Sequence, residues 1–129
     1  MVDFDKIKYY APVVLRISIA VLFLWFGFEQ AISPEDWTGF LPSWISNLSI
    51  SAVSFIYFNA VFEIIFGFLL LLGLFTRTSA LLLGLHLLGI AFTIGYSPLG
   101  VRDFILSIAT LSVFMRGADM WCLDKAKEQ

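Results

Sequence analysis

The sequence predicts an all-α integral membrane protein, built as a four-helix bundle, and two observations support this fold class. Hydrophobic residues make up 60% of the 129 residues, and charged residues only 14%. A soluble domain has about 25% charged residues, because polar side chains must cover its exposed surface. Four apolar segments also approach the roughly 20 helical residues that cross a bilayer core about 30 Å thick. We therefore expect a single domain over residues 1–129 that lies in a lipid bilayer.

The four predicted spans are the apolar runs between charged residues, and they cover residues 11–32, 53–75, 79–96 and 99–117. Residues 38–62 and 78–101 contain no Asp, Glu, Lys or Arg. The first span follows two lysines, as a signal peptide would, but it is longer than a signal-peptide core and lacks an A-x-A-like cleavage site. We expect it to be retained. The segment Phe75–Thr78 predicts a tight turn between antiparallel second and third helices.

The longest connection, residues 33–52, is itself apolar. Its large apolar side chains recur at near-helical spacing, at Trp37, Phe40, Leu41, Trp44, Ile45 and Leu48. Pro34 and Pro42 divide it into short pieces, because proline interrupts a helix. We expect this segment to be amphipathic and to lie in the membrane interface or over the mouth of the bundle.

The distribution of basic residues predicts the orientation. With both termini in the cytoplasm, one side of the membrane holds Lys6, Lys8, Arg16, Arg77, Arg116, Lys125 and Lys127. The other side then holds Arg102 alone. Because cytoplasmic loops are enriched in Lys and Arg, this bias predicts a multi-pass protein of the plasma membrane with both termini cytoplasmic.

Each predicted span carries a stripe of small or polar residues along one face. The stripes are Arg16, Ala20, Phe23, Gly27 and Gln30; Asn59, Glu63 and Gly67; Ser79, His86 and Thr93, with Gly89 beside them; and Asp103, Ser107, Thr110, Phe114 and Gly117. An ionisable side chain at the centre of a bilayer costs about 2.5–3.5 kcal/mol on insertion scales. We therefore expect the stripes to face one another inside the bundle, and Gly27, Gly67, Gly73, Gly84 and Gly89 to lie at close helix contacts.

The ionisable residues define a candidate polar site inside the membrane. Its members are Glu63, His86, Asn59, Asp103, Arg102, Arg16, Gln30, Arg77 and Glu29. At about 1.5 Å per helical residue, Glu63 and His86 both come about 12–15 Å deep. Glu29, Arg102 and Asp103 fall near the outer end of the spans, and Arg16 and Arg77 toward the inner end.

Each of these residues has a structural interpretation beside the functional one. Glu63 is either a hydrogen-bonded structural group or a ligand-binding and proton-carrying group, and His86 is either an interhelical hydrogen-bonding group or part of the site. Arg102 and Asp103 form either the N-terminal cap of the fourth helix or part of the site. Glu29, on the opposite face of its helix, serves an oligomer contact or lies among lipid headgroups. With one histidine and one cysteine, no metal site is expected.

Several short motifs resemble the DoxX family of membrane proteins. They are Phe26-Gly27-Phe28-Glu29-Gln30, Trp37-Thr38-Gly39-Phe40-Leu41-Pro42, Phe62-Glu63-Ile64-Ile65-Phe66-Gly67, Leu72-Gly73-Leu74-Phe75-Thr76-Arg77 and Val101-Arg102-Asp103. The resemblance covers about residues 12–124 and implies a four-helix membrane protein. The DoxX family is similar to the DoxD subunit of an archaeal thiosulfate:quinone oxidoreductase. Other relatives belong to oxidative-stress complexes or act as assembly chaperones. The resemblance implies functional positions at Arg16, Glu63, Arg77, Arg102 and Asp103.

Three functions agree with these features. The first is a subunit or accessory factor of a quinone-linked redox system, with a polar-lined pocket in the membrane and quinone as its ligand. The second is a non-catalytic scaffold or assembly chaperone, and the third is a proton-coupled carrier of a small solute. No self-contained catalytic motif is visible. Expected partners are the lipid bilayer, a quinone or lipid ligand, and a second copy of the chain or a redox subunit; a net charge of −2 gives no reason to expect nucleic acid.

Overall fold

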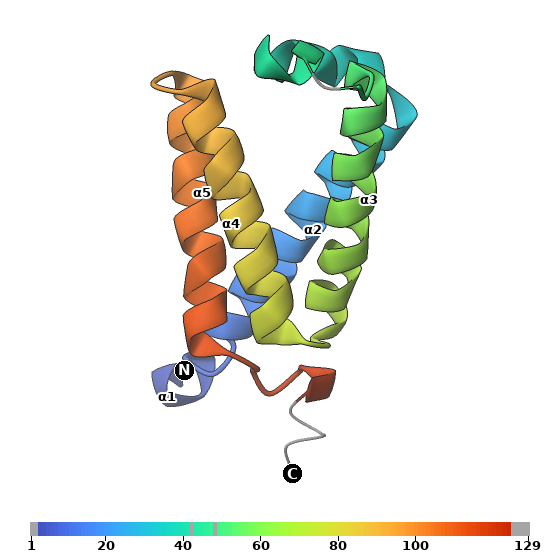
Figure 1. Ribbon diagram of the computed structural model, residues 1–129. Helices are drawn as coiled ribbons and strands as arrows, with labels where there is room; N and C mark the ends of the chain where they lie inside the picture. Colours follow the sequence, from blue (N-terminus) through green and yellow to red (C-terminus); the bar gives the residue numbers. More distant parts are fainter. Residues whose placement is uncertain (1–2, 42, 48, 125–129) are drawn as a thin grey trace.

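Seven helical segments make up the described part of the chain, residues 3–41, 43–47 and 49–124 of the computed structural model (Figure 1). They are α1 (Phe4–Ile7), α2 (Ala11–Ile32), the 3-10 helices η1 (Pro34–Phe40) and η2 (Ser43–Asn47), α3 (Ala52–Leu72), α4 (Thr76–Ile94) and α5 (Pro98–Arg116). The described residues contain no strand, and α2 to α5 are each long and apolar enough to cross a membrane. The predicted all-α fold with four candidate spans is therefore confirmed.

Local sequence explains where two of the long helices begin. The Ser51 hydroxyl accepts a hydrogen bond from the N–H of Ser54 and so caps α3, and the Ser97 hydroxyl accepts one from the N–H of Gly100 and caps α5. Because α5 begins at Pro98, more than a turn before Asp103, the interpretation of Arg102 and Asp103 as its N-terminal cap is wrong.

The turn between α3 and α4 lies earlier in the chain than the sequence predicts. Helix α3 ends at Leu72 and α4 begins at Thr76, so residues 73–75 form the turn. Gly73 has a φ of 74° and ends α3, because glycine adopts this left-handed conformation without strain. The carboxylate of Asp124 accepts hydrogen bonds from the N–H groups of Phe75 and Thr76, at 2.8 and 2.6 Å. This cap comes from a distant part of the chain, so local periodicity could not reveal it.

The four long helices form two antiparallel hairpins, α2 with α3 and α4 with α5 (Figure 1). Glycines allow close approach within each hairpin. A Cβ at Gly27 of α2 would lie 3.2 Å from the carbonyl oxygen of Ala60, and a Cβ at Gly84 of α4 would lie 2.7 Å from the side chain of Leu111. The prediction of a close contact at Gly89 is wrong, because no atom lies within 4 Å of the position its Cβ would take.

The polar stripes face inward, as predicted for most of their members. The buried polar side chains of the spans are Arg16, Gln30, Asn59, Glu63, Thr76, Ser79, Asp103, Ser107 and Thr110. Large apolar side chains instead cover the outside of the helices, among them Val21, Phe58 and Phe92. Thr93 is exposed to solvent-accessible space but borders the pocket between the hairpins, and its hydroxyl donates to the carbonyl oxygen of Gly89, 3.0 Å away. The arrangement is the reverse of that in a soluble bundle, and it suits a lipid surrounding.

The two ends of the bundle differ. At one end, here called the loop end, η1 packs on α2 and α3. Figure 1 shows the two hairpins diverging toward this end. The opposite end, here called the terminal end, holds α1, the α3–α4 turn and residues 118–124 (Figure 1). Most of the buried apolar core, including Phe23, Leu70 and Leu83, belongs to one cluster that joins the two hairpins.

Candidate functional site

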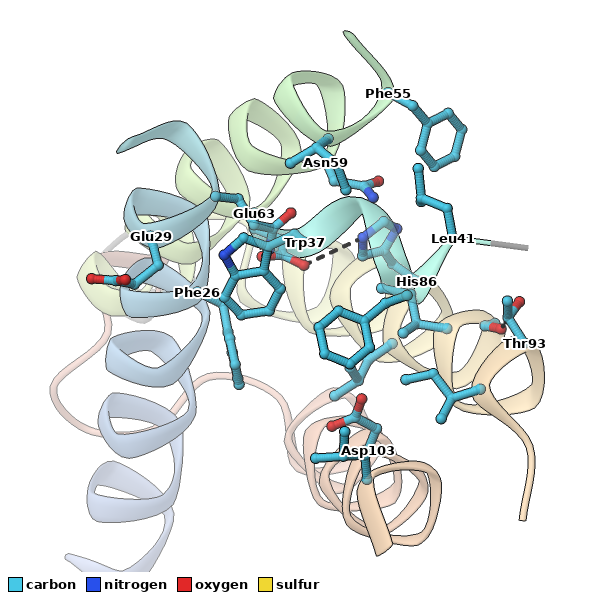
Figure 2. Close-up of a pocket in the computed structure, with 18 of the residues that line it drawn as sticks. Phe26, Glu29, Trp37, Leu41, Phe55, Asn59, Glu63, His86, Thr93 and Asp103 are labelled. Carbon is cyan, nitrogen blue, oxygen red and sulfur yellow. Dashed lines mark hydrogen bonds and ion pairs between the residues drawn. The ribbon is translucent and has the colours of Figure 1, made fainter. Parts of the chain in front are cut away.

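A pocket of about 860 Å³ lies between the two hairpins toward the loop end (Figure 2). All four long helices and η1 contribute to its wall. Pockets for small molecules range from about 300 to 1,000 Å³, so this one can hold a ligand of substantial size. Its wall is mainly apolar and aromatic, and includes Phe26, Trp37, Phe55 and Leu41.

Three helices bring polar side chains together in the wall of the pocket. Glu63 of α3 accepts a hydrogen bond at its Oε2 from the side-chain amide of Gln30 of α2, at 2.9 Å. Its other oxygen, Oε1, lies 3.5 Å from Nε2 of His86 of α4 (Figure 2). The Glu63 side chain is only 4% exposed, so this carboxyl group depends on its neighbours rather than on water.

The positions of these residues along their helices explain why their side chains lie together in the pocket wall. Asn59 and Glu63 are one turn apart on α3, so both side chains face the pocket (Figure 2). The ring of Phe62 packs on the imidazole of His86, with centroids 4.7 Å apart, and fixes the position of that ring. Nε2 of His86 is buried and makes no hydrogen bond within the described part of the chain, so the approach to Glu63 is the main polar contact it has.

A second polar group lies nearer the loop end. Arg102 and Asp103 form an ion pair, with 3.1 Å between Nη2 and Oδ1, and Asp103 is buried whereas Arg102 is half-exposed. The Arg102 guanidinium also lies 5.8 Å from the centre of the Phe26 ring, within the range of a cation–π contact. Phe26 in turn packs edge-to-face against Trp37 of η1. The charged pair is therefore held beside the aromatic wall that η1 completes.

Seven of the nine predicted site residues border this pocket. They are Glu63, His86, Asn59, Asp103, Arg102, Gln30 and Glu29. Glu29 lies at its margin, because Figure 2 shows its carboxylate directed away from Glu63 and His86. The other two, Arg16 and Arg77, do not line it. Their helices place them at the terminal end, because Arg16 is in the second turn of α2 and Arg77 in the first turn of α4.

Arg16 is part of a separate buried cluster. Its Nε donates to Oδ2 of Asp119 at 2.8 Å, and both side chains are 2% exposed. Its Nη1 donates to the carbonyl oxygens of Leu70 and Leu71, at 2.8 and 2.6 Å. These are carbonyls of the last turn of α3, where the regular hydrogen-bond pattern of the helix ends, and that of Leu70 also accepts from the N–H of the capping residue Gly73. Arg16 thus connects the start of α2, the end of α3 and the segment after α5.

Asp119 lies beyond the last span, and sequence reasoning gave it no role. Burial raises its pKa, but the hydrogen bonds from Arg16 and from the N–H of Trp121 outweigh that effect, so the pKa of Asp119 lies below its usual value. The one signal in the sequence was an acidic residue two positions after Gly117, a glycine that ends α5. Its partner lies 103 residues away, and spacing along one helix cannot indicate such a pair.

The comparison with family models supplies the identification. The model of the DoxX family matches residues 11–95, which is more than half of the chain. The chain belongs to the DoxX family. No curated protein and no solved structure matches the chain significantly. The DoxX match spans α2, α3 and α4 and therefore includes Gln30, Glu63 and His86. With its four apolar helices, this DoxX protein is a multi-pass membrane protein.

Proposed function

We propose that this DoxX-family protein is a quinone-binding subunit or accessory factor of a membrane redox system, with both termini in the cytoplasm. The observation that carries the proposal is the pocket of about 860 Å³, which combines an aromatic wall with the polar cluster of Gln30, Glu63 and His86. A quinone head group is a flat apolar ring with polar oxygens on opposite sides. It therefore needs a slot between apolar side chains and polar groups at the edge of that slot.

The residues of the pocket fit such a ring. Phe26 and Trp37 offer aromatic surfaces, and the amide of Asn59 and the imidazole of His86 offer hydrogen-bond donors. The helices that line the pocket are apolar on their outer surfaces, so an isoprenoid tail that passes between them would reach lipid while the ring stays bound. A bound quinone supplies a two-electron, two-proton couple, and a partner subunit would exchange the electrons.

The Glu63 and His86 pair would supply the proton function. The two side chains are 3.5 Å apart and can share one proton, and the pair has no net charge while it holds that proton. Transfer of the proton to a reduced quinone would leave one negative charge on the pair, which a second proton taken up from solution neutralises. The hydrogen bond from Gln30 holds the carboxyl group in place, so that the position of the proton is fixed relative to the pocket. Proton transfer requires donor and acceptor within hydrogen-bond reach, and contacts of this kind that are long in the ligand-free protein shorten when the ligand binds.

The test is a titration of the purified protein in lipid nanodiscs with a short-chain ubiquinone, followed by tryptophan fluorescence. We expect quenching that saturates in the wild type, and an affinity lowered by about tenfold in Glu63→Gln and in His86→Leu, which corresponds to the loss of one buried hydrogen bond to a charged group. Glu35→Gln, at an exposed position of η1, is the matched control and should bind as the wild type does.

Two results would contradict the proposal. One is a linear fluorescence decrease without saturation, which indicates partition of the quinone into lipid. The other is equal affinity in the wild type and in both pocket variants. If Glu63→Gln alters only the stability and a partner protein copurifies in a fixed ratio, the scaffold interpretation replaces this one. A pH-dependent solute flux in liposomes that Glu63→Gln abolishes would instead favour the carrier.

A further inference from the structure

A second, smaller cavity lies at the terminal end, away from the pocket between the hairpins. It measures about 510 Å³ and is lined by the α3–α4 turn, the start of α4 and the end of α5. Two arginines take part, Arg77 in the first turn of α4 and Arg116 in the last turn of α5. Thr76 and Thr78 add hydroxyl-bearing side chains, so the cavity is polar and basic where the other pocket is aromatic.

Both arginines are held in position by the backbone of the segment after α5. The Arg77 guanidinium lies against Gly117, where a Cβ would come within 2.5 Å of its Nε and 2.8 Å of its Nη2. Gly117 has a φ of 77°, so this position favours glycine both for its conformation and for the room it leaves to Arg77. Arg116 donates from Nη1 to the carbonyl oxygen of Ala118, at 3.2 Å. The two cations are therefore fixed beside one cavity.

The charge in this cavity is only partly balanced. The described residues place no carboxylate within 4 Å of either guanidinium. The carboxylate that does border the cavity, that of Asp124, accepts hydrogen bonds from the N–H groups of Phe75 and Thr76. Among the described residues that line the cavity, two cations and one carboxylate leave a net positive charge. The N-terminus of α4 adds to it, because the helix dipole places partial positive charge there.

We propose that this cavity binds a phosphate group, with Arg77 and Arg116 as its two cationic ligands. Guanidinium groups bind phosphate oxygens through paired hydrogen bonds, and two of them suit a group that carries several such oxygens. The cavity lies where α4 begins and α5 ends, which is the level of lipid headgroups at the edge of a span. Basic pockets at this level bind the headgroups of anionic lipids. The phosphate therefore comes either from an anionic lipid or from free phosphate.

The test is native mass spectrometry of the detergent-solubilised protein with three probes: phosphatidylglycerol, phosphatidylcholine and inorganic phosphate. The test variant is the double substitution Arg77→Gln/Arg116→Gln. Its matched control is Lys6→Gln/Lys8→Gln, which removes the same charge from exposed residues at the same end of the protein. We expect one tightly bound phosphatidylglycerol in the wild type and in the lysine control, and binding at least about tenfold weaker in the arginine variant.

The probes distinguish the source of the phosphate. Binding of phosphatidylglycerol without inorganic phosphate identifies a lipid headgroup, and binding of inorganic phosphate alone identifies a free anion; in either case the arginine variant must lose the bound probe. Equal binding in the wild type and the arginine variant would overturn the proposal, as would an equal loss in the lysine control. If the arginine-to-glutamine variant does not fold, Arg77→Lys/Arg116→Lys takes its place as the test variant. It keeps both charges and should bind the probe more weakly than the wild type.

Discussion

At the terminal end of the protein Arg16 and Asp119 form a buried ion pair, and at the loop end Glu63 and His86 form another contact between ionisable groups. The first pair is enclosed by other hydrogen-bonding groups of the protein. Arg16 has four hydrogen bonds, and Asp119 accepts from both Arg16 and the N–H of Trp121. The second borders a cavity, and Nε2 of His86 makes no hydrogen bond within the described residues. The difference separates a charged group that stabilises the fold from one that remains available to a ligand.

The largest effect should come from breaking the pair of Arg16 and Asp119. Asp119→Ala leaves the Arg16 guanidinium buried without its carboxylate, and removal of one partner of a buried pair costs about 3–5 kcal/mol. Denaturant unfolding in detergent micelles, followed by circular dichroism, measures this loss. Asp5→Ala, which removes an exposed carboxylate, should change the free energy of unfolding by less than about 0.5 kcal/mol. A small effect of Asp119→Ala would show that the terminal end is not held by this pair.

The same pair predicts a dependence of stability on pH. The pKa of Asp119 in the folded protein lies below the ordinary value of 3.8, so its carboxylate stabilises the fold above that value. The contribution is lost as the pH falls below about 3.8 and through the lower folded pKa. Unfolding at neutral pH and near pH 3 should therefore show a larger loss for the wild type than for Asp119→Asn, which cannot titrate there. Equal losses would mean that other carboxyl groups account for the acid sensitivity.

A smaller effect on stability is expected from the pair at the pocket. Glu63→Gln keeps the shape of the side chain and a carbonyl oxygen that can accept from Gln30, so we expect a change of about 1 kcal/mol or less in the free energy of unfolding. The same denaturant titration in micelles measures it. A loss as large as that of Asp119→Ala would make Glu63 a structural group and would remove the contrast between the two ends.

Two glycine substitutions should distinguish the part of α4 that borders the pocket, at Gly89, from the part that packs closely on α5, at Gly84. Gly89 borders the pocket, and a Cβ added there would have no atom within 4 Å. Gly89→Ala should therefore stabilise the helix by about 0.5–1 kcal/mol. Gly84→Ala should instead destabilise by about 1–3 kcal/mol, because its Cβ would come within 2.7 Å of Leu111. Thermal unfolding of the two variants side by side checks the opposite signs. If both destabilise, the space beside Gly89 is filled by another part of an assembly.

The sequence was sufficient for the spans and for the polar side chains that line the pocket, because both depend on periodicity within single helices. Glu63 and Asn59 share a face of α3, and Gln30 belongs to the stripe of α2 that turns inward. The sequence was not sufficient to separate Arg16 from Glu63. Both are ionisable residues on inward stripes, and only the tertiary structure shows that Arg16 meets the segment after α5.

The same reason explains the error at the α3–α4 turn. Local patterns placed the turn at Phe75–Thr78, but Asp124 caps α4 from 48 residues away at Thr76. Gly89 was assigned to a helix contact because glycine often marks one, and the structure has open space there instead. Contacts between distant segments and the presence of empty space are both properties of the folded chain, so neither can be found by reading one helix at a time.

The long sequence separation between Arg16 and Asp119 has a consequence for biosynthesis. Arg16 enters the membrane with α2, and its carboxylate partner, Asp119, is translated 103 residues later. During that interval the guanidinium must be accommodated by the translocon, by water or by headgroups, since no other described carboxylate pairs with it. Closure of α2 into the bundle therefore requires that Asp119 has been translated, and a chain that stalls before Asp119 would expose α2 to quality-control proteases.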